Sequence, residues 1–282
     1  INGQDFSWDA GFNISANRNK ITSLASGATR DESNWWFVGH SINSIFDYQY
    51  EGLWQNGDPN LNTLEPGGNV GMIKVLYTGG YNADGTPVRA IGPADRQIIN
   101  TDPDFVGGFN TRLAYKNWDL SMVGAFRSGG VLISTLYGNT SYLNMLSGRR
   151  NNVDVDYWTE ENPNVRYPKP GGIQSSNNPK YGSTLALFDA SYLKIRTITV
   201  GYNFDQEVFK KAGITRLRVY ATVTNPFVFF SPYHDESGMD PETNSLGNEN
   251  QAVNDVYKSR FLTIGTNTPS IRNYMIGLNL TF

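Results

Sequence analysis

The sequence predicts an all-β protein, a transmembrane antiparallel β-barrel with long extracellular loops. Three observations lead to this prediction. Segments of strand length alternate apolar and polar residues, aromatic residues lie at the ends of their apolar sides, and the links between them are alternately short and long. Transmembrane barrels combine these features: apolar side chains face lipid, aromatic girdles lie at both interfaces, and the outer loops are longer than the inner turns.

The last residues of the chain give the pattern most clearly. From Tyr274 to Phe282 every second residue is apolar, as on one face of a strand. The interval spans roughly 20 Å if the strand is tilted, close to the ~25 Å apolar band of an outer-membrane barrel. A soluble sandwich strand would alternate in the same way, but the aromatic ends favour a membrane. We expect Phe282 to be the signal read by the barrel assembly machinery.

Composition excludes several other classes. The chain has 282 residues, of which 39% are hydrophobic, and no apolar run approaches the ~18 residues that a spanning helix needs. It has no cysteine, which rules out disulfides, thiol catalysis and cysteine-bound metals. The net charge of −3 gives no basic footprint, so no nucleic acid is expected as a partner. No cofactor is expected either.

The remaining strands are predicted in chain order. A first strand covers residues 4–16, the polar run Asn17 to Lys20 is expected to turn, and a second strand begins near Ile21. Residues 26–104 form a long loop that can contain two short strands near residues 35–40 and 44–53. Further strands are expected at residues 108–115, 118–127, 192–204, 216–224 and 270–282.

The links between these strands set the orientation. Lys116 and Asn117 make a minimal hairpin turn, and residues 205–213 are a short connector with one helical turn. Residues 132–190, with a helical patch at 143–150, and residues 231–269 are long loops. Seven strands, or nine with the short pair, are odd numbers, whereas bacterial single-chain barrels normally have an even number. Because the chain also opens inside a strand, we expect residues 1–282 to be the C-terminal portion of a larger barrel.

Several passages resemble one known family. These are Phe6-Ser7-Trp8, Tyr50 to Gln55, the block from Asp95-Arg96 to Gly107-Gly108-Phe109, Tyr192 to Tyr202, and Leu217 to Tyr220 with Asn225-Pro226-Phe227. They are similar to the SusC/RagA-type TonB-dependent outer-membrane transporters of the Bacteroidetes. The family often carries D-x-N-x-D-G, a loop suited to a cation, before the Asp-Arg block. Here Asn82 and Asp84 retain part of it, so we expect a turn and no metal.

The resemblance implies a 22-stranded barrel whose lumen is filled by an N-terminal plug, a size known for plugged outer-membrane transporters. It also implies a SusD-like surface lipoprotein as a lid and energy supplied by TonB-ExbB-ExbD through a segment that precedes this chain. The expected function is import of an oligosaccharide or a peptide across the outer membrane. The solute itself is not indicated by the sequence.

Aromatic residues of the long loops are candidates for contacting the solute. Their apolar faces and polar edges suit sugar rings and peptide side chains. They also suit packing of the loops against one another or against the lid, and both interpretations stay open. The candidates are Trp35, Trp36, Tyr48, Tyr50, Trp54, Tyr142, Tyr157 and Trp158.

Charged residues within strands form a second group of candidates. By alternation Arg112, Asp119, Arg127, Arg216 and Arg218 face the lumen, where they can guide an anion or pair with other charges. Lys194 and Arg196 fall on the lipid side near the outer end of their strand. They can contact lipopolysaccharide phosphates there, unless a β-bulge reverses the alternation.

No enzyme is predicted. His234-Asp235-Glu236 is a carboxylate-flanked histidine, but nothing marks a nucleophile beside it, so a solvated cluster is expected. Two rival interpretations are kept. One is a soluble β-rich carbohydrate-binding module, which buffer alone would extract. The other is a passive porin, which would have no plug domain.

Overall fold

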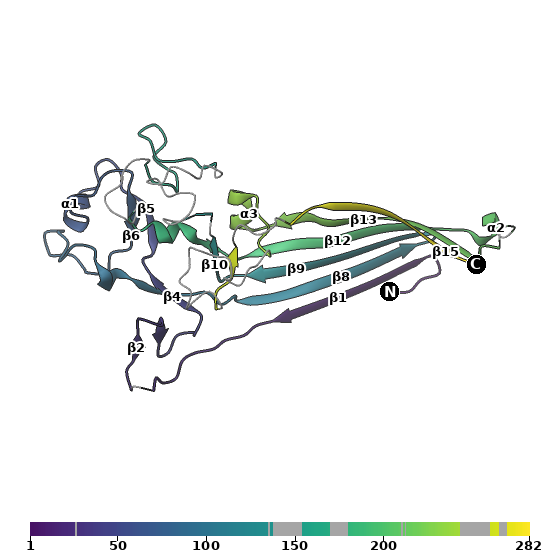
Figure 1. Ribbon diagram of the computed structural model, residues 1–282, viewed down its shortest axis with the longest axis horizontal. Helices are drawn as coiled ribbons and strands as arrows, with labels where there is room; N and C mark the ends of the chain where they lie inside the picture. The colour runs from purple at the N-terminus through teal and green to yellow at the C-terminus, as the bar shows by residue number, and fades with distance from the viewer. Residues whose placement is uncertain are drawn as a thin grey trace.

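The computed structural model contains one large sheet and an assembly of loops beyond one of its ends (Figure 1). It describes residues 1–282 except 26, 135, 138–153, 170–179, 210, 212, 243–259 and 265–269. The sheet is antiparallel and has six strands in the order β1-β8-β9-β12-β13-β15. Their bounds are β1 Phe6–Ser15, β8 Phe105–Tyr115, β9 Trp118–Ser128, β12 Tyr192–Phe204, β13 Arg216–Phe229 and β15 Asn273–Thr281.

Each strand of the sheet pairs with the next large strand along the chain, so the sheet is a meander. In β8 and β9 the register runs from Phe105 opposite Ser128 to Tyr115 opposite Trp118, with a two-residue turn at Lys116. Lys116 has φ of 51°, the left-handed conformation that such tight turns use. This order agrees with the predicted barrel wall, with short links at one end of the sheet and long loops at the other. No helix among the described residues has the length and apolar character needed to cross a membrane.

One predicted strand is wrong. Ile21 makes only an isolated bridge with Val38, and β1 pairs directly with β8, so residues 16–104 are a single loop at the outer end. The polar run after β1 does not turn the chain back. Arg18 instead donates to the Pro103 carbonyl at 2.8 Å, and Asn19 donates to Asp102 at 2.9 Å, just before β8 begins. The sheet therefore has six strands, not the predicted seven or nine.

Three outer loops contain the smaller elements. We call residues 16–104 the first, residues 129–191 the second and residues 230–272 the third outer loop. The first contains β2 Arg30–Asp31, β3 Trp36–Phe37, β4 Ser44–Asp47, β5 Tyr50–Leu53, α1 Leu61–Leu64, β6 Ile73–Val75, η1 Pro93–Asp95 and β7 Gln97–Asn100. The second contains β10 Val131–Ser134, η2 Gly182–Ala186 and β11 Leu187–Asp189, and the third α3 Pro232–Ser237 and β14 Thr263–Ile264. On the opposite side, helix α2 Gln206–Phe209 confirms the helical turn between β12 and β13.

The largest buried apolar cluster belongs to these loops and not to the sheet. It joins Leu53 and Ile73 of the first loop, Leu132 and Phe188 of the second, and Tyr233 of the third. Close approach of the first two loops requires Gly71, where an added Cβ would lie 2.7 Å from the Trp158 ring. The outer loops thus fold as one body with its own core, because each segment alone is too short to bury its apolar side chains.

Candidate functional site

The first functional surface is the apolar face of the sheet. Alternate residues of all six strands expose large apolar side chains on this face, including Ile276 at 87% and Val200 at 40% exposure. The others are Phe6, Trp8, Phe12, Ile14, Phe105, Tyr115, Trp118, Phe204, Phe227, Phe229, Tyr274, Leu278 and Leu280. A soluble domain rarely exposes a continuous apolar patch of this extent. Lipid is the environment that suits such a face.

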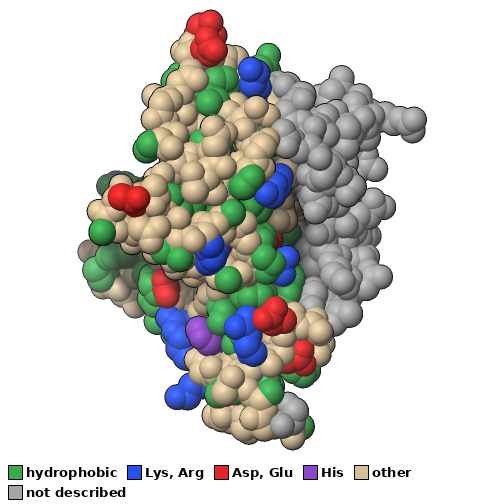
Figure 2. Space-filling view, turned by 90° about the vertical axis from the view of Figure 1, so that its left-hand side faces the viewer, with side chains coloured by type: hydrophobic (Ala, Val, Ile, Leu, Met, Phe, Trp, Pro, Cys, Tyr) green, Lys and Arg blue, Asp and Glu red, His purple; other side chains and the backbone are tan. Residues whose placement is uncertain are grey.

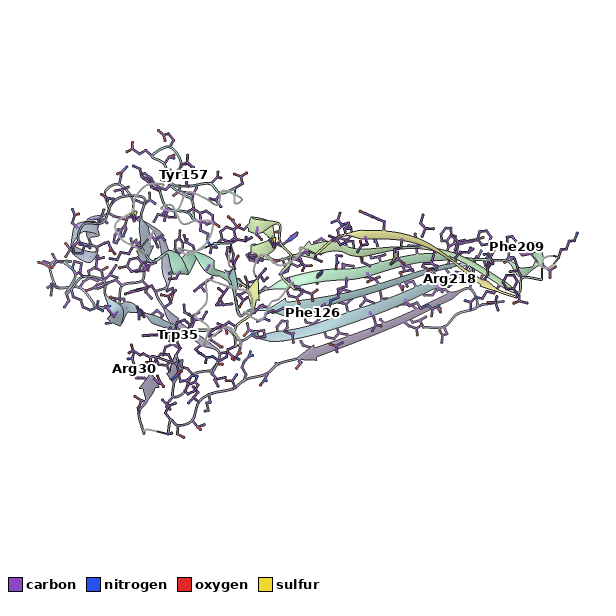
Figure 3. The ribbon with its side chains drawn as sticks, viewed as in Figure 1. Arg30, Trp35, Phe126, Tyr157, Phe209 and Arg218 are labelled. Carbon is purple, nitrogen blue, oxygen red and sulfur yellow. The ribbon has the colours of Figure 1, made fainter. Side chains whose placement is uncertain are left out.

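The opposite, inner face of the sheet brings two of the predicted charges together. Arg218 donates to Asp119 from Nε at 3.0 Å and from its terminal nitrogen at 2.6 Å, and Asn203 donates to the same carboxylate at 3.3 Å. Asp119 is buried. Gly201 makes room for the pair, because a Cβ there would collide with both side chains. Figure 3 shows Arg218 toward the end of the sheet away from the outer loops.

The other predicted charges of this face lie apart. Arg112 is opposite Ser121, and Asp119 lies two residue pairs further along the same pair of strands. Arg216 reaches the Asn203 amide oxygen at 3.5 Å. Arg127 lies at the outer end of β9 and donates to the Thr101 carbonyl at 3.5 Å. The register puts all of them on the inner face, where polar groups line a lumen.

A β-bulge decides the surroundings of Lys194 and Arg196. The pairing of β12 with both neighbours shifts between Ile195 and Thr197, so Arg196 is the extra residue. The alternation therefore reverses, and Lys194 faces the inner side opposite Ala125. Its side chain is 5% exposed and lies 2.5 Å from Asp240 and 3.1 Å from Glu242 of the third outer loop. The predicted position of Lys194 on the lipid side is therefore wrong, because the bulge reverses the alternation there. The buried ammonium of Lys194 also has little exposed surface with which to contact a lipopolysaccharide phosphate.

Arg196 binds the same loop from the edge of this cluster. It is 52% exposed and lies 2.5 Å from Glu242, which also accepts a hydrogen bond of 2.9 Å from the Tyr192 hydroxyl. Two carboxylates of one loop thus bind two cations of one strand. We call Lys194, Arg196, Asp240 and Glu242 the rim cluster. It fixes the third outer loop to the wall of the barrel, and no sequence spacing marks its two acidic members.

Acid is expected to weaken the rim cluster. Burial alone would raise the pKa of Asp240 and of Glu242, but Lys194 and Arg196 outweigh it and hold both pKa values below their usual range. A carboxyl whose pKa is lower in the folded protein than in the unfolded chain stabilises the fold at pH values above its pKa in the unfolded chain. This stabilisation is lost as the pH falls through its pKa in the folded protein. We therefore expect the midpoint temperature of thermal unfolding of the outer loops to decrease when the pH is lowered below about 4.

The doubly neutral variant Asp240→Asn/Glu242→Gln of the full-length protein is the comparison for this pH effect. Its thermal midpoint should be lower at pH 7 and should change less on acidification than that of the unaltered protein. Parallel pH profiles would show that other groups cause the acid sensitivity.

The loop aromatics are mostly packed. Trp54 and Trp158 are 1% and 3% exposed, and Trp158 donates to the Gln55 side chain at 3.0 Å. Tyr48 lies against Tyr181 with ring centroids 4.6 Å apart. Trp35 and Trp36 are half-buried, and the Trp35 ring lies 6.1 Å from that of Phe261. Tyr50 is half-buried and donates to the Arg166 carbonyl at 2.9 Å.

One aromatic candidate is open to solvent. Tyr157 is 48% exposed and lies at the upper edge of the loop assembly in Figure 3. Tyr142 lies outside the described residues. Figure 2 shows this end of the molecule, where apolar side chains are scattered among polar ones and basic side chains lie between them. Of the described candidates, Tyr157 has the ring surface that a solute could reach without rearrangement of the loops.

Burial separates Trp54 from Tyr157 in a simple experiment. Replacing Trp54 with alanine removes a ring from the loop core and should lower the stability of the outer loops by about 3–5 kcal/mol. Replacing the exposed Tyr157 with alanine should change it by less than about 0.5 kcal/mol. Thermal unfolding of the two full-length variants measures the difference, and equal stabilities would contradict the packing described here.

Two features of the first outer loop bear on metal binding. Asp84 accepts hydrogen bonds from the Thr86 amide at 2.9 Å and hydroxyl at 2.6 Å, and the Gly85 amide donates to the Asn82 carbonyl at 2.9 Å. This geometry is a turn, as expected.

Asp95 is fully buried and binds Arg89 together with the Thr78 and Gly92 amides. Burial raises the pKa of Asp95, but these donors outweigh it and keep that pKa well below its usual range.

The histidine cluster of the third outer loop has no catalytic geometry. His234 Nδ1 is 2.8 Å from the Met239 carbonyl, within α3 and the turn that follows it, and the Ser231 side chain caps the helix by accepting from the His234 amide. The ring is thereby held by the backbone.

Comparison with known proteins agrees with this architecture. No family model matches the chain. TonB-dependent receptor P3 of Formosa agariphila is 30% identical over 296 residues, covering 100% of this chain and 27% of the receptor. TonB-dependent receptor SusC of Bacteroides thetaiotaomicron is 27% identical over 267 residues, covering 86% of this chain and 23% of SusC. The chain thus spans about a quarter of the length of these relatives.

Solved structures share the fold. The RagAB peptide importer in its open-open state matches with a TM-score of 0.63 at 20% identity, over 100% of this chain and 27% of that one. Its closed-closed state gives 0.65 at 22% identity, over 100% and 28%. The chain is therefore part of an outer-membrane β-barrel of the TonB-dependent receptor class. The members of this class are not enzymes. Within that class its sequence is similar to SusC, and its fold is similar to that of the RagAB importer.

Proposed function

We propose that this chain forms part of the wall and the outer loops of a transporter that imports a nutrient, an oligosaccharide or a peptide, across the outer membrane. Import is driven by TonB-ExbB-ExbD through a part of the protein outside this chain. A SusD-like surface lipoprotein covers the outer loops. The solute is captured between loops and lid and released inward when TonB remodels the plug.

The observation that carries this proposal is the similarity to TonB-dependent receptor P3 along the whole of this chain. The structure adds a wall with one apolar face and one polar face, as a lumen bounded by lipid requires. The three outer loops share one core, so they offer a fixed surface to a lid protein. The related RagAB structures are described as a peptide importer and transporter, which makes peptides one of the two solute classes to test.

The exposed apolar face weighs against a soluble carbohydrate-binding module, because buffer would then surround Ile276 and Leu278. The passive porin differs from the proposal in its energy requirement. A porin would allow its solute to equilibrate across the membrane in the absence of TonB.

Uptake in cells tests the proposal. Cells that carry the full-length protein should accumulate a labelled oligosaccharide or peptide against a gradient, and accumulation should cease when the gene is deleted, when TonB is removed, or when the proton gradient is collapsed. Uptake that survives both energy treatments would favour the porin. Extraction of the protein by buffer without detergent would favour the soluble module.

A further inference from the structure

A cavity of about 380 Å³ lies between the second and third outer loops. Its walls come from residues 154–156 and 165–167 of the second loop and from α3 of the third. The volume falls within the range of roughly 300–1,000 Å³ that small-molecule sites occupy. Its polar lining consists of Asp154, Asp156, Asp235, Glu236, Arg166 and Tyr167.

The four carboxylates of this cavity differ from the other acidic clusters of the outer loops. Asp95, Asp240 and Glu242 each lie within ion-pair distance of an arginine or lysine. No ion pair is formed by the four cavity carboxylates within the part of the chain that the structure describes. Negative charge in this cavity is therefore not neutralised by the described residues around it.

Arg166, the one cation of the lining, is held by the second loop itself. Its terminal nitrogen donates to the Leu185 carbonyl at 3.1 Å and to the Leu187 carbonyl at 3.0 Å. Its guanidinium carbon also lies 4.1 Å from the centre of the Phe188 ring. These contacts fix the guanidinium against the floor of the cavity, and the carboxylates outnumber it.

A buried hydroxyl provides an independent indication of a ligand. Tyr167 is 2% exposed, is stacked on Tyr137 with ring centroids 5.7 Å apart, and lines the cavity. Burial raises the pKa of Tyr167, and the nearby Glu236 carboxylate, as a hydrogen-bond acceptor and as a charge, raises it further, so the Tyr167 hydroxyl stays protonated. That hydroxyl makes no hydrogen bond of ordinary geometry to any described residue. The Tyr167 oxygen therefore keeps lone pairs that can accept a hydrogen bond from a ligand in the cavity.

The lining favours an organic cation over a metal ion. No group of three or more histidine or acidic side chains within the described ranges is spaced to hold a metal. A nitrogen with several N–H donors can instead span separated carboxylates and donate to the Tyr167 oxygen as well. Val155 and Val165 add apolar wall for the carbon skeleton beside that nitrogen.

We propose that this cavity binds the cationic nitrogen, an ammonium or a guanidinium, of the solute that the transporter captures. Asp235 and Glu236 supply the charge and the Tyr167 hydroxyl accepts a hydrogen bond. The proposal rests on the proposed import function for its biological role, but binding is measured without transport. Two sources carry this chemistry, a basic peptide and an amino sugar.

Calorimetry on the purified full-length protein tests the site with paired probes. The peptide pair is Ala-Lys-Ala and the same peptide acetylated on the lysine nitrogen, and the sugar pair is a glucosamine trimer and its N-acetylated form. We expect one of the two cationic probes to bind at least tenfold more tightly than its neutral partner, with affinity that falls as salt is raised. The binding pair identifies the source of the nitrogen.

Variants assign this binding to the cavity. Asp235→Asn/Glu236→Gln should weaken the cationic probe about tenfold and leave the neutral one unchanged. Tyr167→Phe should weaken binding of the cationic probe severalfold. Because this variant keeps the ring stacked on Tyr137, it still tests the site if the double variant does not fold. Glu160→Gln/Glu161→Gln, which alters exposed carboxylates of the same loop that do not line the cavity, is the matched control.

Three results would overturn the proposal: no binding of either cationic probe, equal binding of cationic and neutral probes, or wild-type affinity in both cavity variants. Failure of uptake by the unaltered protein, with selective binding intact, would instead count against the import function alone.

Discussion

A lysine in place of Leu278 is expected to destabilise the membrane-inserted protein by about 2–4 kcal/mol, the effect of a cation facing lipid at mid-bilayer. Leu278 is midway between the aromatic residues Tyr274 and Phe282 and is 56% exposed on the apolar face. It pairs with Val219 of β13, which lies on the same face. Lipid would thus meet the new ammonium with no polar partner from the neighbouring strand.

Met275→Lys is the matched control, since Met275 belongs to the same strand but lies opposite Thr222 on the inner face. Urea unfolding of both full-length variants in lipid vesicles gives the two free energies. The inner-face variant should lose much less than the Leu278 variant. Equal losses, or no loss at position 278, would contradict the assignment of the two faces.

Loss of Lys194 is expected to have the largest effect on the outer loops. Lys194→Met leaves the buried Asp240 without its cation and Glu242 with only the half-exposed Arg196. Removing one partner of a buried ion pair typically costs about 3–5 kcal/mol, because the remaining charge is uncompensated. Amide hydrogen exchange over α3 and residues 239–242 should therefore accelerate strongly.

Arg196→Met is the comparison within the same cluster. Arg196 is 52% exposed, and exposed ion pairs contribute about 0–1 kcal/mol, so exchange over the same residues should change little. Asp240→Leu added to Lys194→Met should restore part of the lost protection, because the uncompensated carboxylate is gone. Similar exchange in the two single variants would show that the rim cluster does not fix the third outer loop.

The long strands could be predicted because their information is local. An alternation of apolar and polar residues along a long segment can be recognised without knowledge of the rest of the chain. The strands β8, β9, β12 and β15 accordingly lie close to the predicted ranges. The strand predicted at Ile21 failed for a related reason. Asn17 to Lys20 has the composition of a turn, but its side chains bind residues some eighty positions away, before β8.

The site could be predicted only in part. Asp119 and Arg218 were placed on one face by alternation, and the register brings them into contact. The bulge at Arg196 was an open alternative, since no residue type requires it there. The rim carboxylates Asp240 and Glu242 and the hydroxyl of Tyr167 were missed, because contacts between loops distant in sequence leave no periodic signal.

Accessibility along β15 tests the central claim most directly. The chain has no cysteine, so single cysteines at positions 275, 276, 278 and 279 of an otherwise cysteine-free full-length protein can each carry a spin label. In lipid vesicles, labels at 276 and 278 should collide often with dissolved oxygen, which concentrates in the bilayer, and rarely with a water-soluble nickel complex. Labels at 275 and 279 should lack this preference for oxygen. Four similar labels, or labels at 276 and 278 shielded from both reagents, would contradict a sheet whose apolar face meets lipid.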